Sequence, residues 1–401
     1  MSQHFIHRGP GYSPTNKVQL IKGGAGYFQM MERLLDEAKY SVHLQVYIFD
    51  GDETGNRIIE ALVRAAQRNV NVYLLLDAYA SKEFPLEAIE RLKQSGAHFK
   101  WFSPLLRGKG FYVGRRIHHK ILVVDGIHSL VGGLNISNRY NDLPGQPAWL
   151  DWSIYVMGEA SLEILGRCRQ FWPKRIFRND MLIQPRDWRG EVANIGECLV
   201  RMRVNDWVRG KNQISRSYLE WLHRSQHEAI MMSSYFLPGR VLRKNLARAA
   251  KRGVRIKLIL ARYSDVLMAK AAENYLYSWL FRQGIEVYEY QKNILHGKVA
   301  VFDMHWATIG SYNLNNISAY ASVELNVDIY NAAFGQILRE QLNSILLNDC
   351  VQVQPSTFFQ RLTWWKRIWQ WAAYELVRLI FFLFTFYFSQ EKSPAGKKLD
   401  I

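Results

Sequence analysis

Apolar and polar positions follow the same order in both halves of the chain. In the first half, residues 42–49 form an apolar run that predicts a buried strand, and residues 70–76 predict the next strand. Between them, residues 53–69 carry apolar side chains at helical spacing, which predicts an amphipathic helix. The positions of this helix that we expect to face inward are Ile58, Ile59, Leu62, Val63 and Ala66.

The second half repeats this order. Residues 229–236 and 254–260 predict strands, and residues 241–251 predict the helix between them. Its expected inward positions are Val241, Leu242, Leu246 and Ala249. Strand, helix, strand in each half favours βαβ units. We therefore predict an α/β fold of two pseudo-symmetric repeats, each a mixed β-sheet flanked by helices.

The expected boundaries follow from this repeat. The first repeat takes residues 1–175, and an Arg-rich connecting segment takes residues 176–210. The second repeat takes residues 211–350, and a C-terminal segment of different composition takes residues 351–401.

A polar motif, H-x-K-x4-D, occurs once in each half and is followed seven residues past its Asp by Gly-[Gly/Ser]-x-Asn. The two copies are His118, Lys120, Asp125 and Asn135 in the first half, and His296, Lys298, Asp303 and Asn313 in the second. Each lies on a predicted strand pair, 121–125 with 129–134 and 299–303 with 307–312. Because His and Lys are two residues apart, both side chains point to one face of the strand.

Two histidines with lysine and amide partners fit the transfer of a phosphodiester. One imidazole attacks phosphorus, the other protonates the leaving oxygen, and fixed cationic and amide donors hold the phosphate oxygens. A single motif could be a strand histidine satisfied by backbone and a solvated lysine. The duplication with matched tails favours the catalytic interpretation.

These residues identify a resemblance to the phospholipase D superfamily, whose signature is H-x-K-x4-D-x6-G-[GS]-x-N in two copies. Within it, the chain is similar to the bacterial cardiolipin synthases, in a short form without N-terminal membrane-spanning helices. Residues 47–49, 234–238 and 295–298 also resemble that branch, and the resemblance covers residues 18–350. Leu150 and Ile317 depart from it, since Arg is usual at both positions.

The resemblance implies one composite active site between the halves and a covalent phosphatidyl-histidine intermediate. It makes His118 the nucleophile and His296 the acid and base, although the residues alone leave this order open. Lys120, Lys298, Asn135 and Asn313 are expected to bind the phosphoryl oxygens. Asp151 and Glu324 match the acids that orient the histidines in the family. Asp125 and Asp303, the last residues of the motif, are expected to bond backbone near the site.

The charge of the chain points to a polyanionic partner. Lys and Arg number 52 against 35 Asp and Glu, which gives a net charge of +17 and favours anionic lipid or nucleic acid. Three widely spaced cysteines fit a reducing compartment, and no Cys/His or carboxylate cluster suggests a metal, so we expect no metal or cofactor. The first residues lack the apolar core of a secretory signal.

The C-terminal segment decides between these partners. Apolar residues recur at helical spacing over 365–380, and 379–388 is apolar throughout, yet the run is too short to span ~30 Å of hydrocarbon. We interpret it as an interfacial anchor; the alternative is a core helix of the second half. The basic and aromatic segment 104–116, with Arg115 and Arg116, suits a headgroup-binding loop, a nucleic-acid contact or a solvated loop.

The leading hypothesis is a phosphatidyltransferase that makes cardiolipin at the cytoplasmic face of the cell membrane. Anionic phospholipid, phosphatidylglycerol above all, would be donor and acceptor, and association with the membrane would be peripheral. The alternatives are a hydrolytic phospholipase D and a phosphodiesterase or nuclease, although the apolar C-terminus makes nucleic acid the less favoured substrate.

Overall fold

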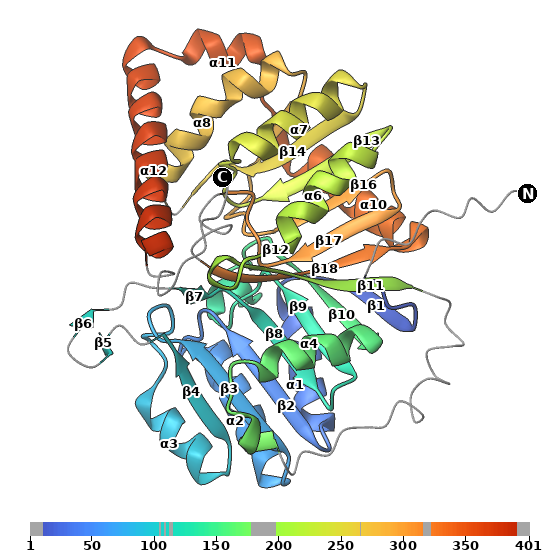
Figure 1. Cartoon of the computed structure of the whole chain (residues 1–401), viewed down its shortest axis with the longest axis vertical. Helices are drawn as coiled ribbons and strands as arrows, with labels where there is room; N and C mark the ends of the chain where they lie inside the picture. Colours follow the sequence, from blue (N-terminus) through green and yellow to red (C-terminus); the bar gives the residue numbers. More distant parts are fainter. Residues whose placement is uncertain are drawn as a thin grey trace, which may run out of the picture.

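The computed structural model describes residues 11–103, 106–107, 110–111, 115–177, 198–264, 266–315 and 322–390. Its two halves each form a layered α/β unit around one mixed sheet, and Figure 1 shows the two units packed against each other. Two α/β repeats were predicted from the apolar pattern, and this prediction is confirmed.

The first unit contains a seven-stranded sheet in the order β1-β10-β9-β8-β2-β3-β4. β2, β3 and β4 are parallel, whereas β8, β9, β10 and β1 continue the sheet in antiparallel pairs. The strands are β1 (Asn16–Lys22), β2 (Ser41–Val46), β3 (Asn71–Asp77), β4 (His98–Phe102), β8 (Lys120–Val124), β9 (His128–Gly132) and β10 (Trp152–Gly158). The helices are α1 (Ala25–Glu37), α2 (Glu53–Gln67), α3 (Leu86–Gln94) and α4 (Glu159–Arg169), and a short turn of helix is η1 (Asn138–Tyr140).

The second unit repeats this topology. Its sheet runs β12-β11-β18-β17-β16-β13-β14-β15-β19, with β7 (Arg116–Ile117) of the first half paired to β18. The strands are β11 (Leu199–Asp206), β12 (Lys211–Asn212), β13 (Glu228–Ser233), β14 (Arg255–Ala261), β15 (Glu286–Tyr290), β16 (Val299–Phe302), β17 (Trp306–Gly310), β18 (Ser322–Tyr330) and β19 (Cys350–Gln352). The helices are α6 (Gln213–Arg224), α7 (Arg240–Lys251), α8 (Leu267–Arg282), α10 (Ala332–Asn348), α11 (Pro355–Arg361) and α12 (Trp364–Gln390). The order β10-β9-β8-β2-β3-β4 thus matches β18-β17-β16-β13-β14-β15.

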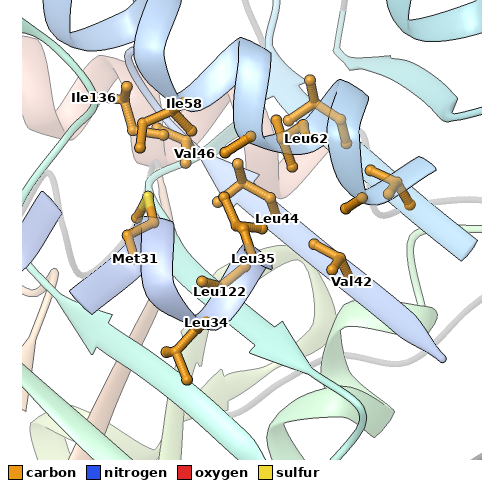
Figure 2. Packing of buried hydrophobic residues seen from close by; sticks show 14 of the residues in the cluster. Met31, Leu34, Leu35, Val42, Leu44, Val46, Ile58, Leu62, Leu122 and Ile136 are labelled. Carbon is orange, nitrogen blue, oxygen red and sulfur yellow. The ribbon is translucent and has the colours of Figure 1, made fainter. Parts of the chain in front are cut away.

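Helix α2 shows why the first unit folds as predicted. Asp52 caps its first turn by accepting a hydrogen bond from Gly55 N at 2.9 Å. All five of its predicted inward positions are buried. Figure 2 shows two of them, Ile58 and Leu62, above Val46 and Leu44 of β2.

Helix α7 departs from the expectation at one position. Leu246 and Ala249 are buried and Leu242 is partly buried, but Val241 is 61% exposed. Five residues correspond to about 140° around a helix, so Val241 lies away from the face that carries Leu246. The prediction that Val241 faces inward was wrong because the apolar stripe begins one residue later.

One apolar core joins the two sheets. It contains Ile121 and Val131 from the first half together with Val299, Ile309 and Leu325 from the second. A shared core of this kind fixes the position of one half relative to the other, because interiors pack at nearly crystalline density.

A buried carboxylate also ties the halves together. Asp206 of β11 is fully buried and forms ion pairs with Arg115 and, at 2.9 Å, with Arg167 of α4. Arg167 is itself 1% exposed. Removing the carboxylate would leave two guanidinium groups facing each other without compensation.

We therefore expect Asp206→Ala to lower the free energy of unfolding by about 3–5 kcal/mol, the usual cost of breaking a buried ion pair from one side. The matched control is Asp36→Ala, which breaks an exposed pair with Arg64 at 2.9 Å and should cost less than about 1 kcal/mol. Urea unfolding of both variants measures the difference. Equal losses for the two variants would contradict the role given to Asp206.

Candidate active site

Backbone bonds bring the two His motifs to one place between the halves. His118 N, in the first half, donates to the carbonyl of Val323 in the second at 2.9 Å. Reciprocally, His296 N donates to the carbonyl of Leu150 in the first half at 2.8 Å. Val323 and Leu150 each precede the acid that follows its own motif. Each histidine is therefore anchored next to the acid of the opposite half.

The histidine–carboxylate pairs cross between the halves. His118 Nδ1 lies 2.8 Å from Glu324 Oε2, and His296 Nδ1 lies 2.5 Å from Asp151 Oδ2. Both acids are fully buried, whereas the His118 and His296 side chains keep 15% and 13% of their surface exposed. With Nδ1 occupied by a carboxylate, Nε2 of each ring is the nitrogen available for chemistry.

Burial dominates the electrostatics of this site. It lowers the pKa of His118 below its ordinary value even though Glu324 acts in the opposite direction, which favours the neutral, nucleophilic imidazole. Burial also raises the pKa of Asp151 to about 6 and lowers the pKa of Lys120 well below its usual range.

The two lysines are held differently. Lys120 Nζ donates to the carbonyl of His118 at 3.1 Å and lies 4.9 Å from the ring centre of Tyr47. Lys298 Nζ donates to Ser234 Oγ at 3.2 Å and to the carbonyl of His296, and it lies 2.8 Å from His296 Nδ1. Because the Nδ1–H of His296 donates a hydrogen bond to Asp151, Nδ1 cannot accept one from Lys298, and the carbonyl and the hydroxyl hold the Lys298 ammonium.

The two asparagines are also unequal. Asn135 Oδ1 accepts from Ile48 N at 3.1 Å, and its Nδ2 donates to the hydroxyl of Tyr140 at 2.9 Å. Asn313 is 6% exposed, and its Oδ1 has no hydrogen-bond partner among the residues that the structure describes. Asn135 is therefore committed to protein contacts, whereas the Oδ1 of Asn313 retains the capacity to accept a hydrogen bond, for example from a hydroxyl group of a substrate.

The second residue of each motif tail, Gly133 in the first half and Ser311 in the second, is matched to the acid of its own half. A Cβ atom at Gly133 would lie 2.3 Å from Asp151 Oδ1, so only glycine leaves room for this carboxylate. In the second half, Ser311 Oγ instead donates to Glu324 Oε2 at 2.5 Å. The Gly-Gly tail thus accommodates an aspartate, and the Gly-Ser tail hydrogen-bonds a glutamate.

Asp125 and Asp303 bond backbone amides, as expected, but they do not lie near the site. Asp125 accepts from the amides of residues 39, 40 and 41 at 2.7–3.0 Å, and Asp303 accepts from those of 226, 227 and 228 at 2.8–2.9 Å. Each lies seven residues beyond its His along an extended strand, roughly 20 Å away. They hold the ends of β8 and β16 that are far from the histidines, so these members of the motif bond backbone away from the site.

Arg115 and Arg116 were expected to bind substrate, and their contacts indicate another role. Arg115 pairs with Asp206, and Arg116 lies 3.8 Å from the buried carboxylate of Asp77 while donating to the carbonyl of Ser103 at 2.8 Å. The Arg115 guanidinium therefore joins the halves, whereas that of Arg116 bonds groups of the first half. The rest of the loop expected at 104–116 lies largely outside the described residues, as does Ile317.

Aromatic residues that the motifs did not reveal complete the site. The Tyr47 ring meets His118 edge-on at 4.7 Å, and Tyr140 meets His296 edge-on at 5.1 Å, with Trp149 at 6.2 Å from the same ring. No spacing rule marks Tyr140 or Trp149. Within the described ranges, no group of three or more His, Cys, Asp or Glu is arranged to hold a metal ion.

Comparison with known proteins places this geometry in a family. The family described as "Cardiolipin synthase, PLD-like domain" matches residues 31–145 and 218–346, one segment in each half. This chain belongs to that family. It is accordingly an enzyme of the phospholipase D superfamily, as the resemblance implied.

Relatives cover nearly the whole chain. Cardiolipin synthase B of Escherichia coli K12 is 34% identical over 90% of this chain and 88% of its own length. Cardiolipin synthase B of Salmonella typhi is 32% identical over 92% of this chain and 89% of its own. The crystal structure of phosphatidylserine synthase from Haemophilus influenzae superposes with a TM-score of 0.68 at 14% identity, covering 92% and 95% of the two chains. The last likeness supports the fold alone.

The buried Asp151 generates a prediction about pH. Because burial raises its pKa from 3.8 to about 6, the folded protein holds this proton more tightly than the unfolded chain does. Its contribution to stability is therefore largest below about pH 4 and is lost as the pH rises to about 6. The loss is at most about 3 kcal/mol.

In Asp151→Asn this titration is absent. The stability of the variant relative to the original protein should rise between about pH 4 and pH 6 and stay level above, which thermal melts across this range would measure. Above about pH 6, where Asp151 is ionised, turnover should fall by at least about a hundredfold, because His296 loses the charged acceptor of its Nδ1–H. A stability difference that does not change with pH would contradict the burial argument.

Proposed function

We propose that this enzyme transfers a phosphatidyl group from one phosphatidylglycerol molecule to a second and so makes cardiolipin. The crossed His–carboxylate pairs carry the proposal. They leave two imidazole Nε2 atoms, one from each half, in a single site beside two lysines and Asn313. This set can form and break a phosphodiester bond through two alternating steps.

In the first step, His118 Nε2 attacks phosphorus and the P–O bond to glycerol breaks. His296 gives its Nε2 proton to the departing oxygen, so glycerol leaves as a neutral alcohol. In the second step, His296 takes a proton from the hydroxyl of the second phosphatidylglycerol, whose oxygen attacks phosphorus. The P–N bond to His118 then breaks, and cardiolipin leaves while both histidines return to their starting states.

The two histidines must begin in different protonation states. His118 has to be neutral to attack, and the burial that lowers its pKa favours that state. His296 has to be protonated, and its contact with the Asp151 carboxylate at 2.5 Å favours the imidazolium. Lys120, Lys298 and Asn313 would then stabilise the negative charge that builds up on the phosphoryl oxygens.

The substrate proposal rests first on the relatives, two of which are cardiolipin synthases B that match along nearly the whole chain. A hydrolytic phospholipase D would use the same two steps with water as acceptor. Nuclease activity remains the alternative of a different substrate class, and it is less favoured because of helix α12.

Helix α12 presents an apolar face that the rest of the described chain does not cover. One side, with Ala373, Tyr374 and Val377, packs against Ala272 and Leu276 of α8 (Figure 1). Opposite to it lie large apolar side chains that are 47–65% exposed: Trp364, Trp365, Ile368, Trp369, Trp371, Leu376 and Leu379. Most of the large apolar side chains expected in this helix are therefore exposed. Only its narrow packed side belongs to a core, as the alternative interpretation expected. The side chains beyond Leu379 and Ile380, which make up most of the apolar run 379–388, lie outside the described part of the chain.

We propose that this face lies on the cytoplasmic surface of the membrane. Tryptophans are enriched at the level of lipid headgroups, and the exposed basic residues of the same helix, Lys366, Arg367 and Arg378, suit anionic lipids. No helix in the described part of the chain is both long enough and apolar enough to span a bilayer. The proposed association is therefore peripheral.

The chemistry is tested with phosphatidylglycerol vesicles and mass analysis of the products. His118→Ala and His296→Ala should each lower turnover by about a thousandfold or more, and the double variant should be little worse, because residues that act as a unit are not additive. His128→Ala, a partly buried histidine on β9 outside the site, is the control and should stay active.

Cardiolipin and glycerol are the expected products. Phosphatidic acid as the main product would replace transfer by hydrolysis, and cleavage of single-stranded DNA without action on lipid would establish the nuclease alternative. A double variant whose loss of turnover equals the sum of the two single losses, expressed as free energies, would contradict a shared site.

The membrane face is tested with Trp365→Glu/Trp369→Glu, which leaves the packed side of α12 unchanged. Burying each indole in the interface is worth about 1.5–3 kcal/mol, so co-sedimentation with anionic vesicles should weaken more than tenfold. Cleavage of a small soluble phosphodiester should persist. Leu86→Glu, at a site 74% exposed on α3, is the matched control. Undiminished sedimentation of the double variant would rule out this face.

A further inference from the structure

The hydroxyl of Tyr140 lies at the reacting nitrogen of His296. Its oxygen is 3.5 Å from His296 Nε2, while Nδ1 of the same ring is held by Asp151 at 2.5 Å. The two rings also meet edge-on with centroids 5.1 Å apart. Hydrogen bonds to catalytic groups are often long before substrate binds and shorten in the complex, so this distance suits a working contact.

Several contacts fix the Tyr140 hydroxyl in place. Asn135 Nδ2 donates to it at 2.9 Å, and the carbonyl of Tyr140 accepts from Gly24 N at 3.1 Å. Trp149 packs on the ring at 5.4 Å, and the side chain is buried, with 1% of the residue exposed. A phenol hydroxyl can accept two hydrogen bonds and donate one, so a hydroxyl that accepts from Asn135 has the chemistry both to accept from an imidazolium and to donate to an imidazole.

The two histidines differ in this respect. His118 has the ring edge of Tyr47 beside it at 4.7 Å, and none of the hydrogen bonds seen in the described parts of the chain reaches its Nε2 from a side chain. His296 has a hydroxyl at the same atom. A nucleophile needs a free lone pair, whereas a group that releases and recovers a proton gains from a partner that can both accept and donate.

We propose that Tyr140 is a positioning residue for the proton of His296, an inference that rests on the transfer reaction proposed above. While His296 is an imidazolium, its Nε2–H donates to the phenol oxygen until the leaving oxygen arrives. After His296 has given its proton to that oxygen, the Tyr140 O–H donates to the neutral Nε2. The bond reverses when the acceptor alcohol returns a proton, so Tyr140 itself neither gains nor loses one.

The charged and titratable groups around His296 influence the pH at which it gains or loses its proton. Asp151 and Lys298 are in direct contact with the ring, and Tyr140 is at its other nitrogen. Lys120, His118 and Glu324 complete the charged groups of the site across the boundary between the halves. Loss of the Tyr140 hydroxyl removes one acceptor of the imidazolium and changes none of these charges.

The test is Tyr140→Phe, which keeps the ring, with two leaving groups compared in the first turnover. Phosphatidylglycerol releases an alkoxide that requires the proton of His296, whereas phosphatidyl-p-nitrophenol releases a phenolate that does not. We expect first-turnover release of glycerol to slow about tenfold and release of p-nitrophenolate to change less than about twofold. KM should change little, since the proposed role of Tyr140 is exercised through its contact with His296.

A pH profile gives a second readout. In Tyr140→Phe, the limb on which activity falls as the pH rises should move to lower pH, because the imidazolium of His296 has lost an acceptor. The control is Tyr155→Phe, which removes a hydroxyl from another Tyr–His pair, that with His128 at 2.7 Å. This control should change neither the rate at which either leaving group is released nor the pH profile of activity.

Equal slowing of both leaving groups would reduce Tyr140 to a structural role and overturn the inference. Unchanged release of glycerol would overturn it as well. If the unmodified enzyme releases neither glycerol nor p-nitrophenolate, the proposed transfer reaction fails, and the inference falls with it. Thermal melts confirm that Tyr140→Phe is folded.

Discussion

Two carboxylates buried at the boundary between the repeats determine the rest of this structure. Asp151 and Glu324 each bond the histidine of the opposite half, and a backbone bond from that histidine to the preceding residue fixes the pairing. A buried carboxylate is costly unless it is hydrogen-bonded. Each acid accepts one bond from its own half, Asp151 from Trp152 N at 2.7 Å and Glu324 from Ser311 Oγ. The histidine of the opposite half supplies a further bond to each acid, so the packing of the halves that completes these contacts also assembles the site.

The two halves share a topology but not a chemistry. Lys120 faces the ring of Tyr47 where Lys298 faces Ser234, and Asn135 is bonded to protein where Asn313 Oδ1 has no partner in the described chain. The two halves offer equivalent positions, and small differences around them suit the proposed division between a nucleophile and a proton carrier. That division is what a two-step transfer requires, because two identical histidines would compete for one protonation state.

The sequence predicted the repeat, the strands around each motif and the core face of α2, because apolar periodicity reports directly on burial. The motif spacing also pointed to the histidines and lysines that the structure brings together, and the family resemblance pointed to the acids Asp151 and Glu324 beside them. The sequence could not show that the acids cross over, that Arg115 is engaged by Asp206, or that Tyr140 lies beside His296. These contacts join residues 90 or more positions apart, and local spacing carries no information about them. Asp125 and Asp303 were misplaced for a related reason, since a motif does not reveal which of its members lie at the far end of a strand.

The central claim is that both repeats build one site with one nucleophile. The most direct measurement is the number of phosphatidyl groups bound per chain after a rapid quench in neutral denaturant, because acid would break the P–N bond. The number is obtained from the intact mass, and peptide mapping then assigns each group to a residue. The account predicts no more than one group per chain, carried by His118. Two groups per chain, one on His118 and one on His296, would contradict it, because each half would then act alone.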